Sequence, residues 1–343
     1  MKKILPMGVP IVKCYSKHAH IFSILGAQTS QYLVWVYNYY VQLYFPEEHR
    51  EFIADYLIPS IFTYAPNLFV SRIERTVAYD IKGGIIEFLK DYIDKGYYIY
   101  TLLDVSKIAT YHCESFHKHD PLIYGYDDEK MEFYFADIYQ KGKYETGIAS
   151  YDEIVDAFGA EEQWKNWNAS EWVLDVVCMK YKDLDVRFQF DKEMYVELLT
   201  NYIEKENSYS KHWGVQGWEK GITPKKRYGI DIYSFVREYI EKERMDRRGL
   251  DVRGFYVIME HKMILEKTIE YLLGDSWKKN YVLLCDLLQL EINEVSYMLN
   301  ACLKYNATGI VTFLDKIREY TLLLEENERK LVPELIDIIR KEV

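Results

Sequence analysis

The sequence predicts an α+β protein whose N-terminal half mixes helices and strands and whose C-terminal half is helical. Two patterns support this division. Up to residue 185, runs of aromatic and β-branched residues alternate with glycine and acidic turn signals, which is typical of strands joined by tight turns. From Asp191 onward, apolar residues recur at intervals of three and four, which indicates amphipathic helices. We therefore expect an α/β domain over residues 1–185 and an all-helical domain over residues 186–343.

A predicted β-hairpin lies at the centre of the N-terminal half. The runs Pro121–Tyr126 and Met131–Asp137 are rich in aromatic and β-branched residues, and a polar stretch (127–130) separates them. This pattern favours a hairpin. An antiparallel hairpin places the start of its first strand beside the end of its second. His119, just before the first strand, is thus expected beside Asp137.

Cys14 is the candidate nucleophile. Apolar residues at helical spacing follow it until Gly26, so Cys14 is expected at or just before a helix N-terminus. There the helix dipole and the free backbone N–H groups favour the thiolate, which lowers the pKa of a thiol. The same N–H groups can stabilise an oxyanion. Free cysteines are also often small buried core residues, so this position alone does not establish catalysis.

Other elements follow from periodicity and from turn residues. In the N-terminal half we expect a helix over Ile85–Lys95 ending at Gly96, a strand over 97–105, a capping box of Ser150 and Glu153 at the start of a helix, and a strand over 173–181. The segment Tyr32–Phe45 is apolar almost throughout, and periodicity does not distinguish a buried helix from a strand there.

The C-terminal half is expected to consist of helices joined by short connections and one long loop. The predicted helices span Asp191–Glu206, Ile230–Glu243, Phe255–Leu273, Tyr281–Tyr305 and Ile310–Arg340, the last in one or two pieces. Several glycines and Pro224 lie between the first two helices, and these residues predict the long loop.

The composition narrows the classes of function. The chain of 343 residues has a formal net charge of −11, which argues against nucleic-acid binding because phosphate contacts need a positive surface. Its five cysteines are odd in number and widely spaced, as expected for reduced thiols in a cytoplasmic protein. No apolar run is long enough for a membrane span, and the proline-broken N-terminus does not resemble a signal peptide. Glycine-rich phosphate loops are missing, so neither ATP nor another cofactor is expected.

Together these residues predict a Cys14–His119–Asp137 triad. A histidine hydrogen-bonded to a cysteine raises its thiolate fraction, and a carboxylate sets the tautomer of the histidine and supports the imidazolium. His112 and His117 are alternative bases, because a shift of the hairpin register by one residue would change which histidine faces the carboxylate.

Three segments carry a resemblance to a known family: KCYSKHAHIFSIL (13–25), WVYNYYVQLY (35–44) and HDPLIYGYDDEKMEFYFADIY (119–139). With the cysteine, histidine and aspartate in this order, they resemble papain-like peptidases of the bacteriocin-leader-processing C39 type. They resemble more closely the N-terminal domain family of butirosin biosynthesis protein H. The likeness covers most of residues 1–180, and within that group the sequence is similar to enzymes of thiotemplated, ribosome-independent peptide pathways.

The resemblance implies a papain-like fold and cysteine-dependent acyl transfer in natural-product (antibiotic) biosynthesis. An acyl or peptidyl chain would arrive as a phosphopantetheine thioester on a carrier protein, pass to Cys14, and be resolved by a small amine to leave an amide. His119 would act as base and then as acid, and Asp137 would orient it. The helical domain would bind the carrier or the substrate. A peptidase of the same fold is the alternative, with water as the acceptor.

The sequence departs from the family pattern at the oxyanion donor. Papain-like enzymes usually place a glutamine a few residues before the cysteine, and residues Met7–Lys13 contain none. Backbone N–H groups at Cys14 and Tyr15 are the default donors, and Gln28 or Gln42 are side-chain candidates.

Two other classes of function are consistent with the residues. A non-catalytic protein could bind a partner through its helical half, with the triad as a relic. Basic islands in the helical half are either solvated surface or a dock for an acidic carrier protein; they comprise Lys225, Lys226, Arg227, Arg244, Arg247 and Arg248. A zinc site could draw on ligands whose spacing matches no strong zinc motif, namely His18, His20, His112, Cys113, His117 and His119.

Overall fold

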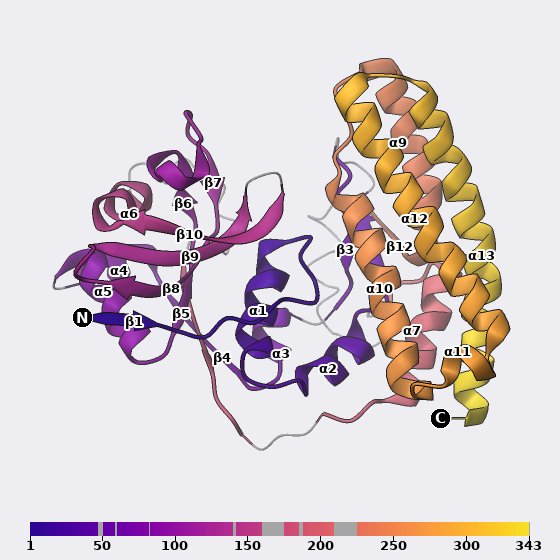
Figure 1. Cartoon of the computed structure of the whole chain (residues 1–343), viewed down its shortest axis with the longest axis horizontal. Coiled ribbons are helices and arrows are strands. Elements are labelled where there is room, and N and C mark those ends of the chain that lie inside the picture. The colour runs from indigo at the N-terminus through magenta and orange to yellow at the C-terminus, as the bar shows by residue number, and fades with distance from the viewer. Residues whose placement is uncertain are drawn as a thin grey trace. The chain divides into compact units, whose positions relative to one another are not determined.

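The computed structural model describes residues 1–46, 51–58, 60–81, 83–139, 142–159, 175–184, 188–208 and 225–342 (Figure 1). It has mixed α+β architecture, with antiparallel sheets in the N-terminal part and long helices in the C-terminal part. This coarse division agrees with the sequence prediction. Residues 209–224 of the predicted long loop lie outside the described residues.

The chain divides into two compact units, and each is built from two separate stretches. The first unit comprises Met1–Tyr32 and Ser60–Phe188, and the second comprises Leu33–Pro59 and Gln189–Val343. The sequence predicted a single boundary after residue 185. In the structure, the aromatic segment that begins at Leu33 instead packs with the C-terminal helices, because its strand pairs with a strand that follows the first of them.

The first unit is organised around an antiparallel sheet of seven described strands. Their order is β10-β9-β8-β5-β11-β4, and β1 pairs with the far end of β8. The strands are β1 (Lys2–Ile4), β4 (Leu68–Ile73), β5 (Tyr98–Tyr100), β8 (Leu122–Asp127), β9 (Glu132–Tyr139), β10 (Lys143–Ser150) and β11 (Val176–Tyr181); a separate pair consists of β6 (Leu103–Asp104) and β7 (Lys118–His119).

Helices and short turns pack against this sheet. They are α1 (Ser16–Gly26), α3 (Ile61–Tyr64), α4 (Arg75–Asp80), α5 (Gly84–Asp94), α6 (Tyr151–Phe158) and the 3-10 turns η1 (Val105–Lys107) and η2 (Ala109–Tyr111). Helix α1 contacts β9 and β11, and α5 contacts β5 and β8. Nearly every residue of α1 after Lys17 is buried, including the polar residues His18, His20 and Ser23.

The predicted hairpin is confirmed. Strands β8 and β9 are antiparallel, and the register pairs Leu122 with Ala136, so the residues flanking this pair, His119 and Asp137, come to the same end of the hairpin. A bulge between Ile123 and Gly125 interrupts the ladder. Strand β9 continues to Tyr139, two residues beyond the prediction, because it pairs along its whole length with β10.

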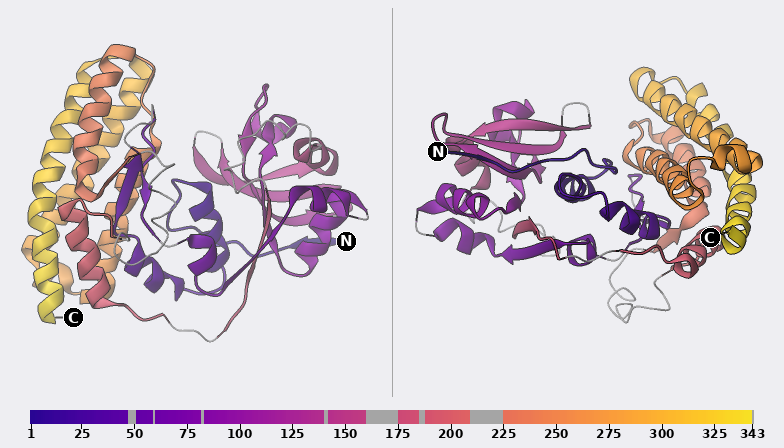
Figure 2. Two further views of the ribbon diagram at one scale, coloured as in Figure 1. Left: turned by 180° about the vertical axis from the view of Figure 1, so that it is seen from behind. Right: turned by 60° about the horizontal axis from the view of Figure 1, so that its bottom comes forward.

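The second unit consists mainly of long helices, seen from two further sides in Figure 2. Each predicted helix is present within three residues at either end, and the last is one continuous helix that contains Pro333. The helices are α2 (Tyr32–Tyr39, whose first residue belongs to the first unit), α7 (Lys192–Glu204), α9 (Ile232–Asp246), α10 (Arg253–Leu273), α11 (Trp277–Asn280), α12 (Val282–Thr308) and α13 (Thr312–Glu342).

The expectation of an all-helical C-terminal domain is wrong in one respect. Strand β12 (Lys226–Tyr228) pairs with β2 (Leu43–Pro46), and β2 pairs with β3 (Asp55–Tyr56). The three residues of β12 are too few to show a period of two, and their partners lie far away in the sequence. The sequence did not distinguish a helix from a strand over Tyr32–Phe45. The structure has one of each there: α2 and β2.

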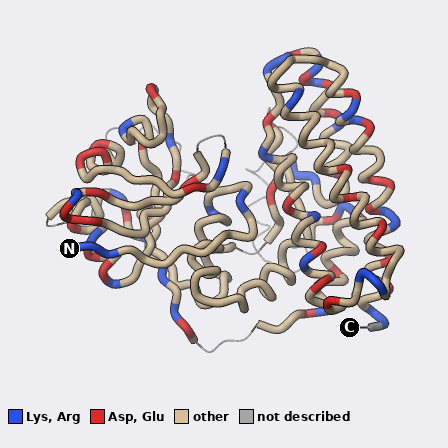
Figure 3. The backbone as a smooth tube through the Cα atoms, viewed as in Figure 1, with Lys and Arg blue, Asp and Glu red and all other residues tan. Residues whose placement is uncertain are grey.

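The core of the second unit contains a large apolar cluster among its helices. Trp277, Leu284, Leu335 and Ile339 are almost fully buried in one cluster with apolar residues of α7 and α10, which is the burial that stabilises long amphipathic helices. Acidic and basic residues are interspersed along the length of these helices (Figure 3). Among the described residues, no helix is both long and apolar enough to cross a membrane.

The predicted capping box at the start of α6 is present. Ser150 Oγ accepts a hydrogen bond from the Glu153 backbone, and the Glu153 carboxylate accepts one from the Ser150 backbone. We expect Ser150→Ala to lower the free energy of unfolding by about 1 kcal/mol in urea titrations, because it leaves a helix N–H group without its cap. The exposed Asp156→Ala in the same helix serves as the control, and an equal loss in both variants would contradict the role of the cap.

Candidate active site

His119 and Asp137 form a direct hydrogen bond. The Nδ1 atom of His119 on β7 lies 2.5 Å from Oδ2 of Asp137 on β9. The Asp137 side chain is fully buried, and its other oxygen accepts a hydrogen bond of 2.7 Å from the backbone N–H of Ile138. Since an ionised carboxylate only accepts, Nδ1 carries the proton, and Nε2 on the far side of the ring can act as a base.

The electrostatics of this pair favour its charged form. Burial alone would lower the pKa of His119, but the hydrogen bond and the negative charge of Asp137 outweigh it and raise the pKa to about 9. Burial alone would raise the pKa of Asp137, and the hydrogen bond from His119 reverses this and lowers it. A histidine held in this way supports an adjacent thiolate as an imidazolium.

Tyr111 is a site residue that sequence reasoning missed. Its hydroxyl donates a hydrogen bond of 2.5 Å to Asp137 Oδ2, the same oxygen that contacts His119. The turn η2 that carries Tyr111 is held in place by two contacts: the Ala109 N–H donates to Glu153 Oε1, and Thr110 Oγ1 donates to the Ile148 carbonyl. A tyrosine just before the histidine-rich loop is the signal that was available, but its partner is set only by folding.

Asp120 links helix α1 to the strand that carries His119. Its carboxylate accepts hydrogen bonds from Ser16 Oγ (2.7 Å) and from the Tyr100 hydroxyl (2.6 Å). Its backbone carbonyl lies 2.8 Å from His20 Nε2, and Tyr144 lies 3.0 Å from His20 Nδ1. A carbonyl only accepts, so Nε2 of His20 is protonated and Nδ1 accepts from Tyr144. Burial lowers the pKa of His20, which keeps it neutral.

Cys14 lies at the start of α1, as predicted. It is half-buried and comes two residues before Ser16, the first residue of the helix. Because Ser16 is bound to Asp120, the chain at Cys14 is brought into the neighbourhood of His119. The group of clustered ligating side chains in the described part of the chain consists of His119, Asp120 and Asp137 and includes no cysteine. The complete triad stays a prediction.

The alternative bases occupy other positions. His112 is exposed and adopts a left-handed backbone (φ 52°), and His117 is exposed as well. The His117 backbone N–H donates to Asp104, and its ring stacks on His119 with centroids 6.1 Å apart. Of the three loop histidines, His119 is the one bonded to Asp137.

The zinc ligands suggested by the sequence do not gather as one set among the described residues. His18 stacks on Phe22 inside α1, and the thiol of Cys113 donates to the Ser115 carbonyl. The ligating atoms that do cluster, within 4.8 Å of one another, belong to His119, Asp120 and Asp137. Such a set could bind a divalent cation, but its carboxylates already accept hydrogen bonds from Ser16, Tyr100 and Tyr111.

Neither side-chain candidate for the oxyanion donor is placed beside Cys14 within the first unit. Gln28 follows the C-terminal end of the 11-residue helix α1, and its backbone N–H donates to the Leu25 carbonyl. Gln42 belongs to the second unit, where its amide donates to the Glu206 carbonyl and to Ser208. The backbone N–H groups near Cys14 therefore remain the candidates.

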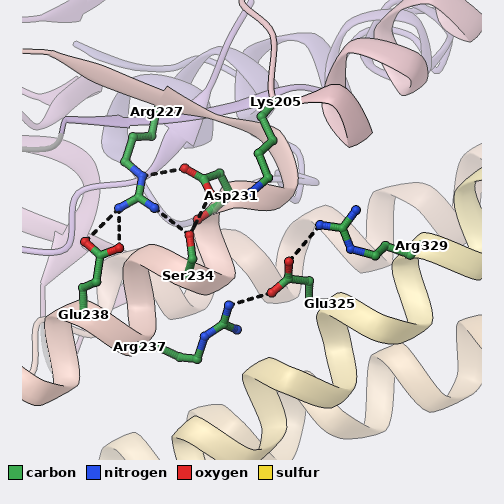
Figure 4. Close-up of polar contacts among 8 residues, drawn as sticks. All are labelled: Lys205, Arg227, Asp231, Ser234, Arg237, Glu238, Glu325 and Arg329. Carbon is green, nitrogen blue, oxygen red and sulfur yellow. Dashed lines mark hydrogen bonds and ion pairs between the residues drawn. The ribbon is translucent and has the colours of Figure 1, made fainter.

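The basic islands serve contacts within the second unit. Figure 4 shows Arg227 bonded to Asp231, Ser234 and Glu238, with distances of 2.5–2.9 Å. Arg244 donates to Asp315 at 2.6 Å. The charges of Arg227 and Arg244 are thus paired within the unit, which favours a structural role for these two residues over a dock for an acidic protein.

No family model matches the chain, and no curated protein matches it significantly. The resemblance noted in the sequence thus rests on the cysteine, histidine and aspartate segments alone. The function has to be argued from the chemistry of the site.

The His119–Asp137 pair predicts a specific titration. In an NMR titration of the histidine ring, His119 should have its midpoint near pH 9, and Asp137→Asn should move the midpoint down toward 6.5. Because the folded pKa is the higher one, the proton stabilises the fold fully below pH 6.5, and this stabilisation is lost as the pH rises through 9. The control, Tyr111→Phe, keeps the pair, and an unchanged midpoint in Asp137→Asn would refute it.

Proposed function

We propose that the protein is a cysteine-dependent acyltransferase that forms amide bonds. The observation that carries this proposal is the 2.5 Å contact between His119 Nδ1 and Asp137 Oδ2, next to a helix that begins just after Cys14. A buried carboxylate, an oriented imidazole and a thiol at a helix N-terminus are the components of thiol-based acyl transfer.

The proposal includes a papain-like arrangement for the first unit. In such a fold, the helix that follows the nucleophilic cysteine packs on an antiparallel sheet that supplies the histidine and its carboxylate or amide partner. The contacts of α1 with β9, and the positions of His119 on β7 and Asp137 on β9, are consistent with this arrangement.

The reaction proceeds in two steps. Cys14 Sγ attacks the carbonyl carbon of an acyl or peptidyl thioester, the bond to the phosphopantetheine sulfur of a carrier protein breaks, and His119 gives a proton to that sulfur. A small amine then attacks the acyl-enzyme, His119 accepts its proton, and the amide leaves as Cys14 is regenerated. The thioester is already an activated acyl group, so the reaction needs no ATP, and no atom changes its oxidation state, so it needs no redox cofactor.

Two further residues support this chemistry. Tyr111 gives Asp137 Oδ2 a second donor, which stabilises the carboxylate and limits its rotation when His119 changes its protonation state. Asp120 fixes the start of α1 through Ser16, so it positions Cys14. In this proposal the catalytic residues belong to the first unit, and the second unit binds the carrier protein or the substrate of a cytoplasmic biosynthetic pathway.

The first experiment is the intact mass of the protein after incubation with an acyl thioester of pantetheine. We expect a mass gain equal to the acyl group in the wild type and none in Cys14→Ala. Cys113→Ala is the matched control, because Cys113 is also half-buried but lies in the loop before His119 and not at the start of α1; this variant should be acylated normally. A gain that persists in Cys14→Ala would refute Cys14 as the nucleophile.

The acceptor is then identified by adding amines to the acylated protein. Release of the acyl chain as an amide supports the transferase. Release as a free acid with every amine tested would favour the peptidase alternative. His119→Ala should slow acylation by roughly 100-fold or more, the usual contribution of a general base.

A variant at Asp120 tests the positioning of Cys14. We expect Asp120→Ala to slow acylation by roughly 10- to 100-fold, because small displacements of reacting groups are costly. The NMR midpoint of His119 should remain well above 6.5, since Asp137 still pairs with it. A variant that acylates at the wild-type rate would show that Asp120 plays no part in placing the nucleophile.

A further inference from the structure

The second unit encloses a lysine and two glutamates at its centre. Lys262 on α10, Glu291 on α12 and Glu328 on α13 have side chains that are 0%, 0% and 1% exposed. The Nζ atom of Lys262 is in direct contact with Oε1 of Glu328 and lies 3.3 Å from Oε2 of Glu291. Three helices therefore place an amine against one carboxyl group, with a second carboxyl group beside it.

Two tyrosine hydroxyls point at the carboxyl group of Glu328. Tyr202 on α7 donates to Oε2 at 2.9 Å, and Tyr233 on α9 donates to Oε1 at 3.0 Å. The rings of the same tyrosines lie 5.8 Å from Lys262 Nζ. Paired donors on a carboxyl group stabilise the negative charge that develops when a nucleophile attacks its carbon.

Keeping these three side chains charged in a buried position costs free energy. The free energy lost when charged groups leave water is offset only when further hydrogen bonds stabilise those groups. Neither oxygen of Glu291 has a hydrogen bond of normal geometry with another described residue. Burial lowers the pKa of Lys262, and it raises the pKa of Glu291 to about 7, so the carboxyl group of Glu291 can exchange a proton near neutral pH.

We propose that Lys262 and Glu328 form an intramolecular amide (isopeptide) bond, and that Glu291 relays the proton. Nothing outside the second unit takes part in this reaction, so it is independent of the acyl transfer proposed above.

The reaction is a balanced condensation. The nitrogen of Lys262 bonds to Cδ of Glu328 after the ammonium loses a proton. Glu291 takes a proton from the attacking nitrogen and gives it to the departing oxygen of Glu328. The Cδ–O bond breaks, and that oxygen leaves as water with both of its protons drawn from the original ammonium. An ammonium and a carboxylate are replaced by one neutral amide, so the net charge of the cluster does not change and no oxidant is needed.

The surroundings favour the amide. Holding the amine against the carboxyl group of Glu328 replaces an encounter in solution, an advantage of several orders of magnitude in effective concentration. The condensation also removes two buried charges. A small cavity of about 10 Å³ borders Glu328, Tyr202 and His261, which is room for about one water molecule, the product that must leave.

The test is the mass of the denatured full-length protein, followed by a tryptic digest. We expect the protein to be lighter than its sequence by about 18 Da, the mass of one water molecule. The digest should contain residues 254–267 joined to residues 319–329, with fragmentation that places the link between Lys262 and Glu328. The sequence mass, with residues 254–262, 263–267 and 319–329 recovered as separate peptides, would overturn the proposal, and so would a link between other residues.

Two variants separate the roles of the three residues. Glu291→Gln keeps both partners but removes the relay, so the loss of water should fall to a small fraction of the molecules. Glu294→Gln is the matched control on the same helix, and it should be linked as fully as the wild type. Complete linkage in Glu291→Gln would show that Glu291 plays no part in the mechanism. If that variant fails to fold, the mass of the wild type still shows whether the bond forms.

Discussion

The buried carboxylate of Asp137 is the constraint around which the first unit is arranged. A negative charge removed from water requires donors on every side, and the fold supplies them from three separate elements. His119 comes from β7, Tyr111 from the turn η2, and the backbone N–H of Ile138 from β9 itself. The hairpin, the turn and the short strand pair thus have their positions set by one side chain.

Only part of this arrangement was predictable from the sequence. The hairpin could be predicted, because alternating aromatic residues and a polar turn are local signals. The pairing of His119 with Asp137 then follows from the register of its two strands. The roles of Tyr111 and Asp120 could not be predicted, since tertiary packing brings their partners, Asp137 and Ser16, to them. Strand β12 was missed for the same reason: three residues have no periodicity, and their partner strand belongs to the distant segment that begins at Leu33.

The two units differ in how their buried charged groups are stabilised. In the first, the carboxylate of Asp137 is surrounded by donors, and its charge is stabilised by hydrogen bonds that leave the imidazole able to exchange protons. In the second, Glu291 and Lys262 are enclosed by helices with few donors. The first environment suits repeated proton transfer, and the second suits a single irreversible neutralisation.

The division of each unit into two stretches has a consequence for biosynthesis. Strand β2 leaves the ribosome well before its partner β12, so the second unit cannot complete its sheet until most of the chain has been made. During that interval the aromatic residues Trp35, Tyr40 and Phe45, buried in the finished protein, have no core to join. Non-local pairing of this kind slows folding and leaves apolar surface exposed to other chains. The nascent protein is therefore expected to depend on a chaperone until its last helices emerge.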